Sequence, residues 1–239
     1  MTTLLVVLLA TTLPSYYVYA APVKKDTNRK CKAWADAGEC DKNAGYMRTS
    51  CQTSCKEYDH KMGIQSKDDD DDAASIAHIK NFFQLSALDI DNNELPFSDL
   101  KGKITVIVNV ASRCGYTESH YKGLKLLFDS VKDTKSVEIL AFPSNQFGKQ
   151  EPGTCEEIKM FATKEKGAEY RIMNKIDVNG PAAHQVYKFL KKEAGPASIS
   201  WNFSTYFVVS PAGVVRSYSG VEPMDLQELI VGLLENKEL

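Results

Sequence analysis

One cysteine, Cys114, stands where a thiol could act as a nucleophile. It follows a continuous β-branched run, residues 104–110 (ITVIVNV), by four positions and precedes a stretch with helical spacing, residues 118–131. The run predicts a strand buried on both faces, and a sulfur between that strand and a helix lies near the helix N-terminus. Unpaired N–H groups and the helix dipole favour a thiolate there, which suits redox or acyl chemistry. The alternative is that Cys114 is a small buried hydrophobic residue, the commoner role of a lone cysteine.

The residues around Cys114 exclude two familiar kinds of cysteine enzyme. The sequence Cys114-Gly115-Tyr116-Thr117 ends in threonine, whereas disulfide exchange through a Cys-x-x-Cys motif needs a second sulfur. A cysteine protease needs a histidine partner, and no histidine of this chain lies in a recognisable protease context. The four histidines are expected to be solvated or to be ordinary packing residues: His60, His78, His120 and His184.

The periodicity from about residue 76 onward alternates between strands and helices. A capping box, Thr154 with Glu157, predicts the start of one helix, and Pro211-Ala212-Gly213 predicts a hairpin turn. The expected strands are 104–110, 137–142, 171–176, 205–210 and 214–218, and the expected helices are 118–131, 154–167, 184–192 and 224–234. This order predicts an α/β domain with a thioredoxin-like three-layer fold.

Three segments, in this order, resemble the signatures of the glutathione peroxidase family. They are residues 109–117 (NVASRCGYT), residues 141–153 (AFPSNQFGKQEPG) and Trp201-Asn202-Phe203, and the resemblance covers residues 76–235. It implies that residues 76–239 form a glutathione peroxidase domain. It also implies that Cys114 is the peroxidatic nucleophile, that Gln146, Trp201 and Asn202 complete a catalytic tetrad, and that the reaction passes through a cysteine sulfenic acid.

Peroxide reduction gives these residue types a physical reason. A thiolate that attacks the O–O bond expels an alkoxide or hydroxide, and uncharged N–H donors stabilise the charge on both sulfur and oxygen. Gln146, the Trp201 indole and Asn202 can supply such donors without titrating. Taken singly, Trp201 and Asn202 also fit a buried aromatic residue and a turn former. Because cysteine stands where the family's best-known members have selenocysteine, we expect a slower but genuine peroxidase.

The residue that would resolve the sulfenic acid is harder to assign. Plant and insect relatives carry a resolving cysteine in the helix after the second signature, but residues 161–163 are Phe-Ala-Thr here, and Ser144 replaces another common cysteine. Cys155 is the remaining candidate. As the first residue of its capped helix it faces free N–H groups, and it is either a resolving cysteine or an exposed spare thiol. The resemblance implies no bound cofactor and no metal, with glutathione or a thioredoxin-like protein as reducing co-substrate.

The segment between Gly167 and Tyr187 lacks the insertion that tetrameric relatives use at subunit contacts. The resemblance is therefore to the monomeric branch of the family, which accepts bulky lipid hydroperoxides. We expect a monomer that reduces hydrogen peroxide and organic or lipid hydroperoxides in an antioxidant response to oxidative stress.

The other four cysteines crowd into one N-terminal segment. Residues 24–58 resemble a ShK toxin-like domain, in which six cysteines form three bridges. Lys24 and Tyr58 occupy the first and sixth cysteine positions, so the resemblance implies that two bridges remain, Cys31–Cys51 and Cys40–Cys55. A zinc site is the rival, but the segment has no Cys-x2-Cys pair and an oxidising compartment favours disulfides. This small disulfide-stapled module is expected to be a spacer or docking domain. A secreted binding protein that acts through it, with a vestigial peroxidase domain, is the alternative function.

The two ends of the chain and the segment between the domains carry targeting and linker signals. Residues 1–20 combine an apolar run with no charge and predict a signal peptide, an uncleaved anchor being the alternative. Five aspartates at 68–72 predict a solvated linker over residues 59–75. Residues 236–239 (NKEL) resemble an ER-retrieval signal, so the mature protein is expected to be secreted or to remain in the ER lumen.

Charge and hydropathy exclude further classes of function. The chain carries 29 Lys and Arg against 31 Asp and Glu, and this net charge of −2 provides no basic field for nucleic acid. No stretch of about twenty apolar residues lies beyond the N-terminus, so no stable membrane span is expected.

Overall fold

The computed structural model describes residues 26–43, 46–47, 50–61 and 75–235. The chain divides into two compact units, Met1–Tyr58 and Asp59–Leu239. The predicted signal peptide, the five aspartates of the predicted linker and the NKEL ending lie outside the described residues.

The N-terminal unit is a small helical module whose core is made largely of cysteine. Its helices are α1 (Cys31–Asp36), α2 (Glu39–Lys42) and α4 (Gln52–Lys61), the last of which runs on into the predicted linker. The two disulfides are those that the ShK-like resemblance implied, Cys31–Cys51 and Cys40–Cys55. Tyr58 packs against this core at the position of the missing sixth cysteine.

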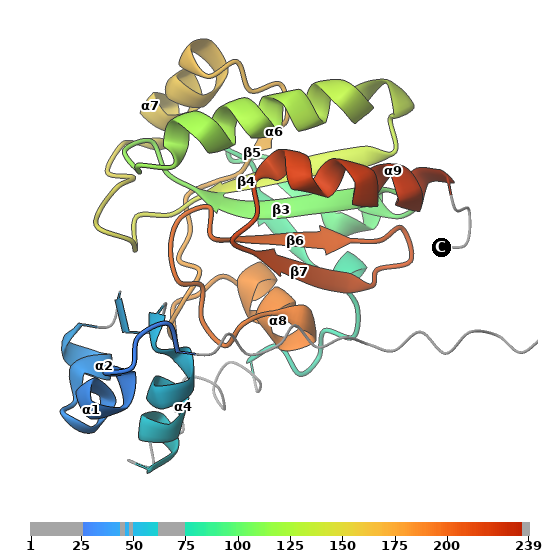
Figure 1. Ribbon diagram of the computed structural model, residues 1–239. Coiled ribbons are helices and arrows are strands. Elements are labelled where there is room, and N and C mark those ends of the chain that lie inside the picture. The colour runs from blue at the N-terminus through green and yellow to red at the C-terminus, as the bar shows by residue number, and fades with distance from the viewer. Residues whose placement is uncertain (1–25, 44–45, 48–49, 62–74, 236–239) are drawn as a thin grey trace, which may run out of the picture. The chain divides into compact units, whose positions relative to one another are not determined.

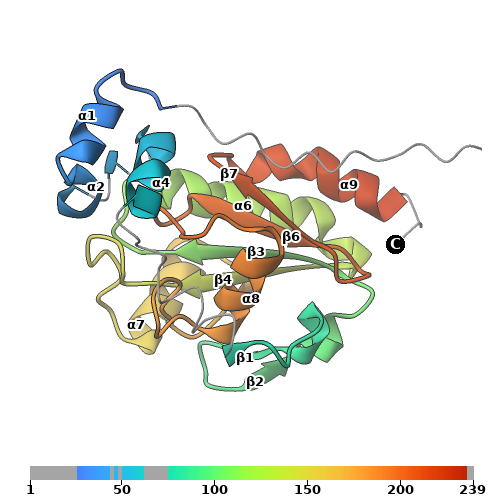
Figure 2. The same cartoon turned by 90° about the horizontal axis from the view of Figure 1, so that it is seen from below.

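The second unit is a three-layer α/β domain built on a five-stranded sheet (Figure 1, Figure 2). The strands are β3 (Ile104–Val110), β4 (Val137–Pro143), β5 (Arg171–Ile172), β6 (Thr205–Val209) and β7 (Val215–Ser219). Their order in the sheet is β5-β4-β3-β6-β7. The pairs β3–β4 and β4–β5 are parallel, whereas β3–β6 and β6–β7 are antiparallel. The predicted thioredoxin-like arrangement is confirmed, with β3 at its centre.

Helices cover both faces of the sheet (Figure 1). The helices and turns of this unit are η1 (Phe82–Gln84), η2 (Phe97–Leu100), α6 (Thr117–Val131), η3 (Lys132–Thr134), α7 (Cys155–Met160), α8 (Gln185–Ala194), η5 (Pro223–Leu226) and α9 (Gln227–Glu235). Helices α6 and α9 lie on one face and α8 on the other. Gly123 lets α6 approach η5 closely, because a Cβ at this position would lie 2.9 Å from the Pro223 Cγ.

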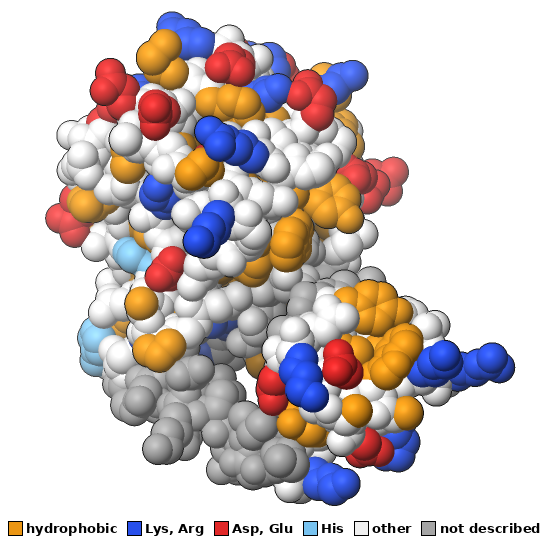
Figure 3. Space-filling model, turned by 90° about the vertical axis from the view of Figure 1, so that its left-hand side faces the viewer, with side chains coloured by type: hydrophobic (Ala, Val, Ile, Leu, Met, Phe, Trp, Pro, Cys, Tyr) orange, Lys and Arg blue, Asp and Glu red, His pale blue; other side chains and the backbone are white. Residues whose placement is uncertain are grey.

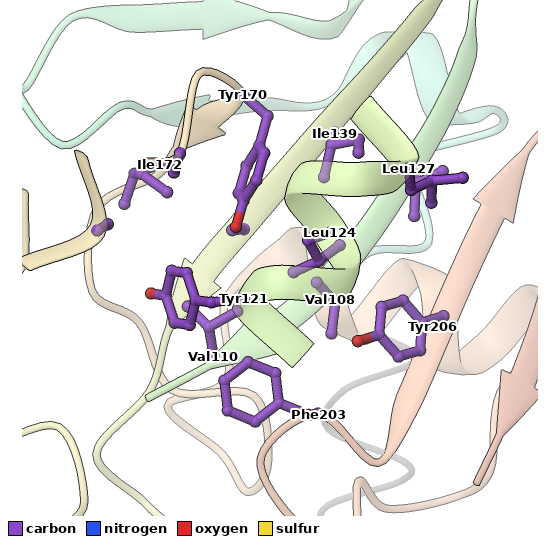
Figure 4. Packing of buried hydrophobic residues seen from close by; sticks show 14 of the residues in the cluster. Val108, Val110, Tyr121, Leu124, Leu127, Ile139, Tyr170, Ile172, Phe203 and Tyr206 are labelled. Atoms are coloured by element: carbon purple, nitrogen blue, oxygen red, sulfur yellow. The ribbon is translucent and has the colours of Figure 1, made fainter. Parts of the chain in front are cut away.

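Strand β3 is buried along its whole length, as its apolar run predicted. Alternate side chains point to opposite faces of a strand, so β3 contributes to two cores. Val106 and Val108 belong to the core under α6, and Ile107 belongs to the core over α8. Figure 4 shows the first of these cores, in which Leu124 and Tyr121 of α6 lie over the sheet. The strand that leads to Cys114 is thus fixed from both sides.

Two predicted elements have different boundaries. The capping box at Thr154 is confirmed, but the α-helix ends at Met160 and continues as a π-helix, Phe161–Glu165, before Gly167 in the left-handed region. The strand expected over 171–176 is only two residues long. The Met173 N–H still donates to β4, but the Asn174 N–H donates to the Leu88 carbonyl, and the chain bonds to β4 again only at Ile176. The regular pairing with β4 is therefore interrupted at Asn174.

Two further differences concern short elements. The hairpin β1 (Ser86–Leu88) and β2 (Glu94–Pro96) was not predicted, because three-residue strands carry too few side chains to show alternation. The final helix expected from residue 224 begins as the 3-10 turn η5 and becomes α-helical only at Gln227.

The surface of the molecule carries charges of both signs. In the face shown by the space-filling view, acidic and basic side chains are interspersed (Figure 3). Among the residues that the structure describes, no helix combines the length and the apolar character needed to cross a membrane.

Candidate active site

Cys114 lies in the turn between β3 and α6, where the sequence placed it, and is only 8% exposed. Thr117, the first residue of α6, holds this turn. Its Oγ1 accepts a hydrogen bond from the Cys114 N–H at 3.0 Å and donates one to the Ala111 carbonyl at 2.6 Å. The threonine at the second position of a Cys-x-x-Cys motif is thus a structural brace, and it keeps the nucleophile in one place.

Trp201 precedes β6 and joins the two cores of the domain. Its ring is half-buried, contacts Phe147 with ring centroids 5.8 Å apart, and packs against side chains of both faces of the sheet. The indole N–H makes no hydrogen bond to any residue that the structure describes. Donation of this hydrogen to a substrate oxygen stays a prediction.

Asn202 is fully buried and connects all three predicted motifs. Its Oδ1 accepts a hydrogen bond from Asn109 Nδ2 at 3.1 Å, and its Nδ2 donates to Gln150 Oε1 at 3.3 Å. The Gln150 carbonyl accepts the N–H of Arg113, the residue before Cys114, at 3.0 Å. The first, second and third motifs are thereby brought to one end of the sheet.

The backbone after Asn202 is bent to make this arrangement possible. Phe203 has φ of 63°, a left-handed conformation that a bulky side chain rarely adopts. Its N–H donates to the Asn109 carbonyl at 2.9 Å, and Asn109 Nδ2 also donates to the Trp201 carbonyl at 3.3 Å. Asn109 of β3 therefore anchors the tryptophan turn to the strand that carries Cys114.

Gln146 is exposed, and its amide binds the backbone of the loop before α8. Its Oε1 accepts the N–H groups of Val178 at 2.8 Å and Asn179 at 2.9 Å, and its Nε2 donates to the Asn179 carbonyl at 2.9 Å. These bonds fix the orientation of the amide and leave one of its two hydrogens unused. Donation of that hydrogen to the reacting sulfur or oxygen stays a prediction.

The sequence interpretation missed Asn179, which joins Gln146 to the tryptophan segment. Its side-chain amide forms a two-way pair with Ile199: Nδ2 donates to the Ile199 carbonyl at 2.8 Å, and Oδ1 accepts the Ile199 N–H at 2.9 Å. Its backbone makes the similar pair with the Gln146 amide. The only sequence signal was an Asn-Gly pair that also fits an ordinary turn.

Cys155 is the first residue of α7, as predicted, but it is half-buried rather than an exposed spare thiol. Its Sγ donates to Asn174 Oδ1 at 2.9 Å, and Asn174 Nδ2 donates in turn to Asn92 Oδ1 at 2.8 Å. Cys114 and Cys155 are both free thiols in this structure.

The comparisons with known proteins agree with this geometry. The family model for glutathione peroxidase matches residues 82–191, and the ShK domain-like model matches residues 23–57. The glutathione peroxidase-like peroxiredoxin gpx1 of Schizosaccharomyces pombe is 42% identical over 160 residues, which are 65% of this chain and 100% of that protein. The chain belongs to the glutathione peroxidase family. It is a glutathione peroxidase-like oxidoreductase with an N-terminal ShK-like domain.

Other members of the glutathione peroxidase family show similar relations to this one. The phospholipid hydroperoxide glutathione peroxidase 1, chloroplastic, of Arabidopsis thaliana is 42% identical over 165 residues, 67% of this chain and 70% of that protein. The crystal structure of T. cruzi GPX1 covers 67% of this chain and 100% of its own, with a TM-score of 0.54 and 32% identity. The fold around the site is therefore that of a known glutathione peroxidase.

Burial also acts on a histidine of α6, the helix that follows Cys114. His120 of α6 is buried, its Nδ1 lies 2.6 Å from the Tyr206 hydroxyl, and its ring packs against Phe203. Burial lowers the pKa of His120, although the nearby Glu222 carboxylate acts in the opposite direction. His120 is thus a packing residue that favours the neutral form. Within the described residues, no cluster of His, Cys, Asp or Glu could hold a metal ion.

Proposed function

We propose that this protein is a thiol-dependent peroxidase that reduces hydrogen peroxide and organic or lipid hydroperoxides through a sulfenic acid on Cys114. One observation carries the proposal. Cys114 is held in a braced turn at the end of the sheet where the Trp201–Asn202 segment also lies, joined to it through Gln150. A nucleophile in a fixed position among uncharged donors is what peroxide reduction needs.

The proposed first step is an in-line displacement on oxygen. The Cys114 thiolate attacks one oxygen of the hydroperoxide, the S–O bond forms, and the O–O bond breaks with its electron pair leaving on the second oxygen. That oxygen takes a proton and departs as water or an alcohol, and Cys114 becomes the sulfenic acid. The free Trp201 N–H and the unused Gln146 amide hydrogen are the donors assigned to the charge on oxygen.

The proposed recycling uses an external thiol. A first thiol condenses with the sulfenic acid to give a mixed disulfide on Cys114 and water. A second thiol then attacks the sulfur of the first, the bond to Cys114 Sγ breaks, and the products are a disulfide of the two external thiols and the reduced enzyme. Glutathione or a thioredoxin-like protein would supply these thiols. The hydrogen bond from Cys155 Sγ to Asn174 Oδ1 supports a one-cysteine cycle, because this bond would have to break before Cys155 could react with Cys114.

Turnover by two serine variants tests this scheme. We expect Cys114→Ser to lose at least about a thousandfold in peroxide turnover with glutathione, because no other group supplies the nucleophile. We expect Cys155→Ser, the matched control, to stay within about twofold of the wild type. An active Cys114→Ser protein would reject the proposal. If Cys155→Ser loses turnover only with a thioredoxin-like reductant, a two-cysteine cycle replaces the one-cysteine cycle.

Bulky substrates are a finer part of the proposal. Tyr116, two residues after Cys114, is 54% exposed, and the ring of Trp201 is only half-buried, so apolar surface borders the nucleophile. The name of the Arabidopsis thaliana relative points to phospholipid hydroperoxides. Turnover measured under the same conditions with hydrogen peroxide and with phosphatidylcholine hydroperoxide in liposomes tests whether lipid hydroperoxides are substrates. Reduction of hydrogen peroxide alone would reject them.

The proposed setting is the secretory pathway, and the proposed state is a monomer. Two disulfides in the module fit an oxidising compartment. N-terminal sequencing of protein from expressing cells should show cleavage after Ala20, and deletion of residues 236–239 should raise the secreted fraction if NKEL acts in retrieval. Sedimentation at several concentrations measures the mass of the particle, which should be that of one chain.

The alternative function is binding through the ShK-like module alone. It would be supported only if the Cys114→Ser protein kept the full physiological activity of the wild type.

A further inference from the structure

A buried carboxyl group, Glu151, lies next to the turn that carries the nucleophile and has no part in the proposed tetrad. The residue has 0% exposure. Its Oε1 accepts a hydrogen bond from the Ser112 hydroxyl at 2.7 Å, and its Oε2 is buried without a hydrogen-bond partner among the described residues. A buried acid with one satisfied oxygen is costly for a fold to keep, so its presence calls for a role.

The contacts of Glu151 place that role at the Cys114 turn. Ser112 stands two residues before Cys114, which puts their α-carbons within about 7 Å of each other. The adjacent Gln150 carbonyl accepts the N–H of Arg113 at 3.0 Å. Two neighbouring residues of the second motif, Gln150 and Glu151, thus accept hydrogen bonds from two neighbouring residues before Cys114, Arg113 and Ser112. On the opposite side, the Glu151 N–H is held by Asn145 Oδ1 at 2.9 Å.

Burial and the neighbouring groups act on the charge of the Glu151 carboxyl in opposite directions. Burial raises the pKa of this carboxyl, against the lowering effects of the Ser112 hydrogen bonds and of the Lys175 and Arg113 charges. Lys175 does not pair with the carboxyl oxygens, because its Nζ donates to the backbone carbonyls of Glu151 at 3.4 Å and Gly153 at 2.7 Å. From α6, Tyr121 faces the same interior region.

Two tyrosines share that interior region with the acid. The hydroxyls of Tyr121 and Tyr170 are buried and have no hydrogen-bond partner among the described residues. Figure 4 shows both rings within the core that packs on β3 and β4. Burial raises the pKa of Tyr121 first, and Tyr170 and Glu151 raise it further, which places the acid within electrostatic reach of the phenol. Ionisation of Glu151 would therefore add a negative charge beside two phenols that cannot neutralise it, with only the Ser112 hydrogen bonds and the Lys175 and Arg113 charges acting in its favour.

We infer that Glu151 is a positioning residue for the peroxidase reaction: its carboxyl, acting through Ser112, holds the turn that presents Cys114. This inference rests on the proposed function. When Glu151 ionises, its buried negative charge opposes the negative charge that develops on the departing oxygen, and the reaction slows.

Stopped-flow oxidation of reduced protein by hydrogen peroxide tests the inference over pH 5 to 9. Glu151→Gln keeps the size and an acceptor for Ser112, so its rate constant should stay within about threefold of the wild type at neutral pH. Glu151→Leu and Ser112→Ala break the link and should lower the rate constant by about tenfold and about threefold respectively. The ratio of wild-type to Glu151→Gln rate constants should fall as the pH rises, because only the wild type can ionise here. A purely structural role would not produce this change in ratio.

Glu157→Gln is the matched control, because Glu157 is a nearby glutamate that is exposed and whose carboxylate caps α7 by accepting the Thr154 N–H, without any bond to the Cys114 turn. It should leave the rate constant unchanged. A folded Glu151→Leu protein with the wild-type rate constant would overturn the inference, and so would a pH-independent ratio. If the wild-type protein itself does not react, the proposed function fails instead, so the two failures are distinguishable. Where Glu151→Leu does not fold, Ser112→Ala and Glu151→Gln decide.

Discussion

The two units of this protein use cysteine for opposite purposes. In the N-terminal module, four cysteines with at most 2% exposure form two disulfides and much of the core. In the peroxidase domain, two cysteines stay free at the starts of helices, and apolar side chains on both faces of a sheet supply the cores. A small module cannot bury enough apolar surface to fold unaided, whereas a domain of about 160 residues can. The larger unit therefore folds without using its cysteines as disulfides.

Removal of one disulfide should produce the largest effect and should confine it to the module. We expect Cys40→Ala combined with Cys55→Ala to destabilise the module by about 2–4 kcal/mol and to unfold much of it. The chain has two tryptophans, Trp34 in the module and Trp201 in the domain. During urea unfolding, fluorescence of a Trp201→Phe protein therefore reports the module, and fluorescence of a Trp34→Phe protein reports the domain. If the double cysteine variant also lost the unfolding transition of the domain, the separation of the two units would be contradicted.

Substitution of Asn179 should affect the domain alone, through catalysis. Asn179→Ala removes both bonds to Ile199, which loosens the backbone that orients the Gln146 amide. We expect about a tenfold lower rate constant for Cys114 oxidation, equivalent to about 1.4 kcal/mol. Asn81→Ala, which removes the cap of η1 elsewhere in the domain, is the control for simple loss of stability. Equal rate constants in the two variants would reject the role of Asn179 in orienting the Gln146 amide.

A smaller effect should appear as acid sensitivity of the domain. Burial lowers the pKa of His120 and of His184 below the ordinary 6.5, so the folded state binds fewer protons than the unfolded chain. This contribution to stability is complete above pH 6.5 and is lost as the pH falls through the folded-state pKa. Urea titrations between pH 7.5 and 5 should show a weaker decline for His120→Gln than for the wild type. The exposed His78→Gln should match the wild type, and identical slopes in all three would exclude His120 as a cause.

Local sequence patterns were sufficient to predict the elements whose conformation depends on neighbouring residues in the chain. The strand before Cys114, the helix after it and the Thr154 capping box were all predicted, because each depends on neighbouring residues. The convergence of Cys114, Trp201 and Asn202 required the family resemblance, since the segments are far apart in the sequence.

Contacts made by tertiary structure were not predictable in this way. Asn179 and Glu151 act through hydrogen bonds to residues 20 to 39 positions away, and nothing in their own neighbourhoods distinguishes them from turn or surface residues. The short hairpin β1–β2 was missed because its strands are too short to show alternation, and the π-helix after α7 because its residues fit an ordinary helix equally well.

The most direct measurement is peptide mass spectrometry of the reduced protein after one equivalent of hydrogen peroxide, with a reagent that traps sulfenic acid. The account predicts a trapped sulfenic acid on Cys114 and an unmodified Cys155. A Cys114–Cys155 disulfide would contradict the one-cysteine cycle. An unmodified Cys114 would contradict the central claim that this residue is the peroxidatic nucleophile.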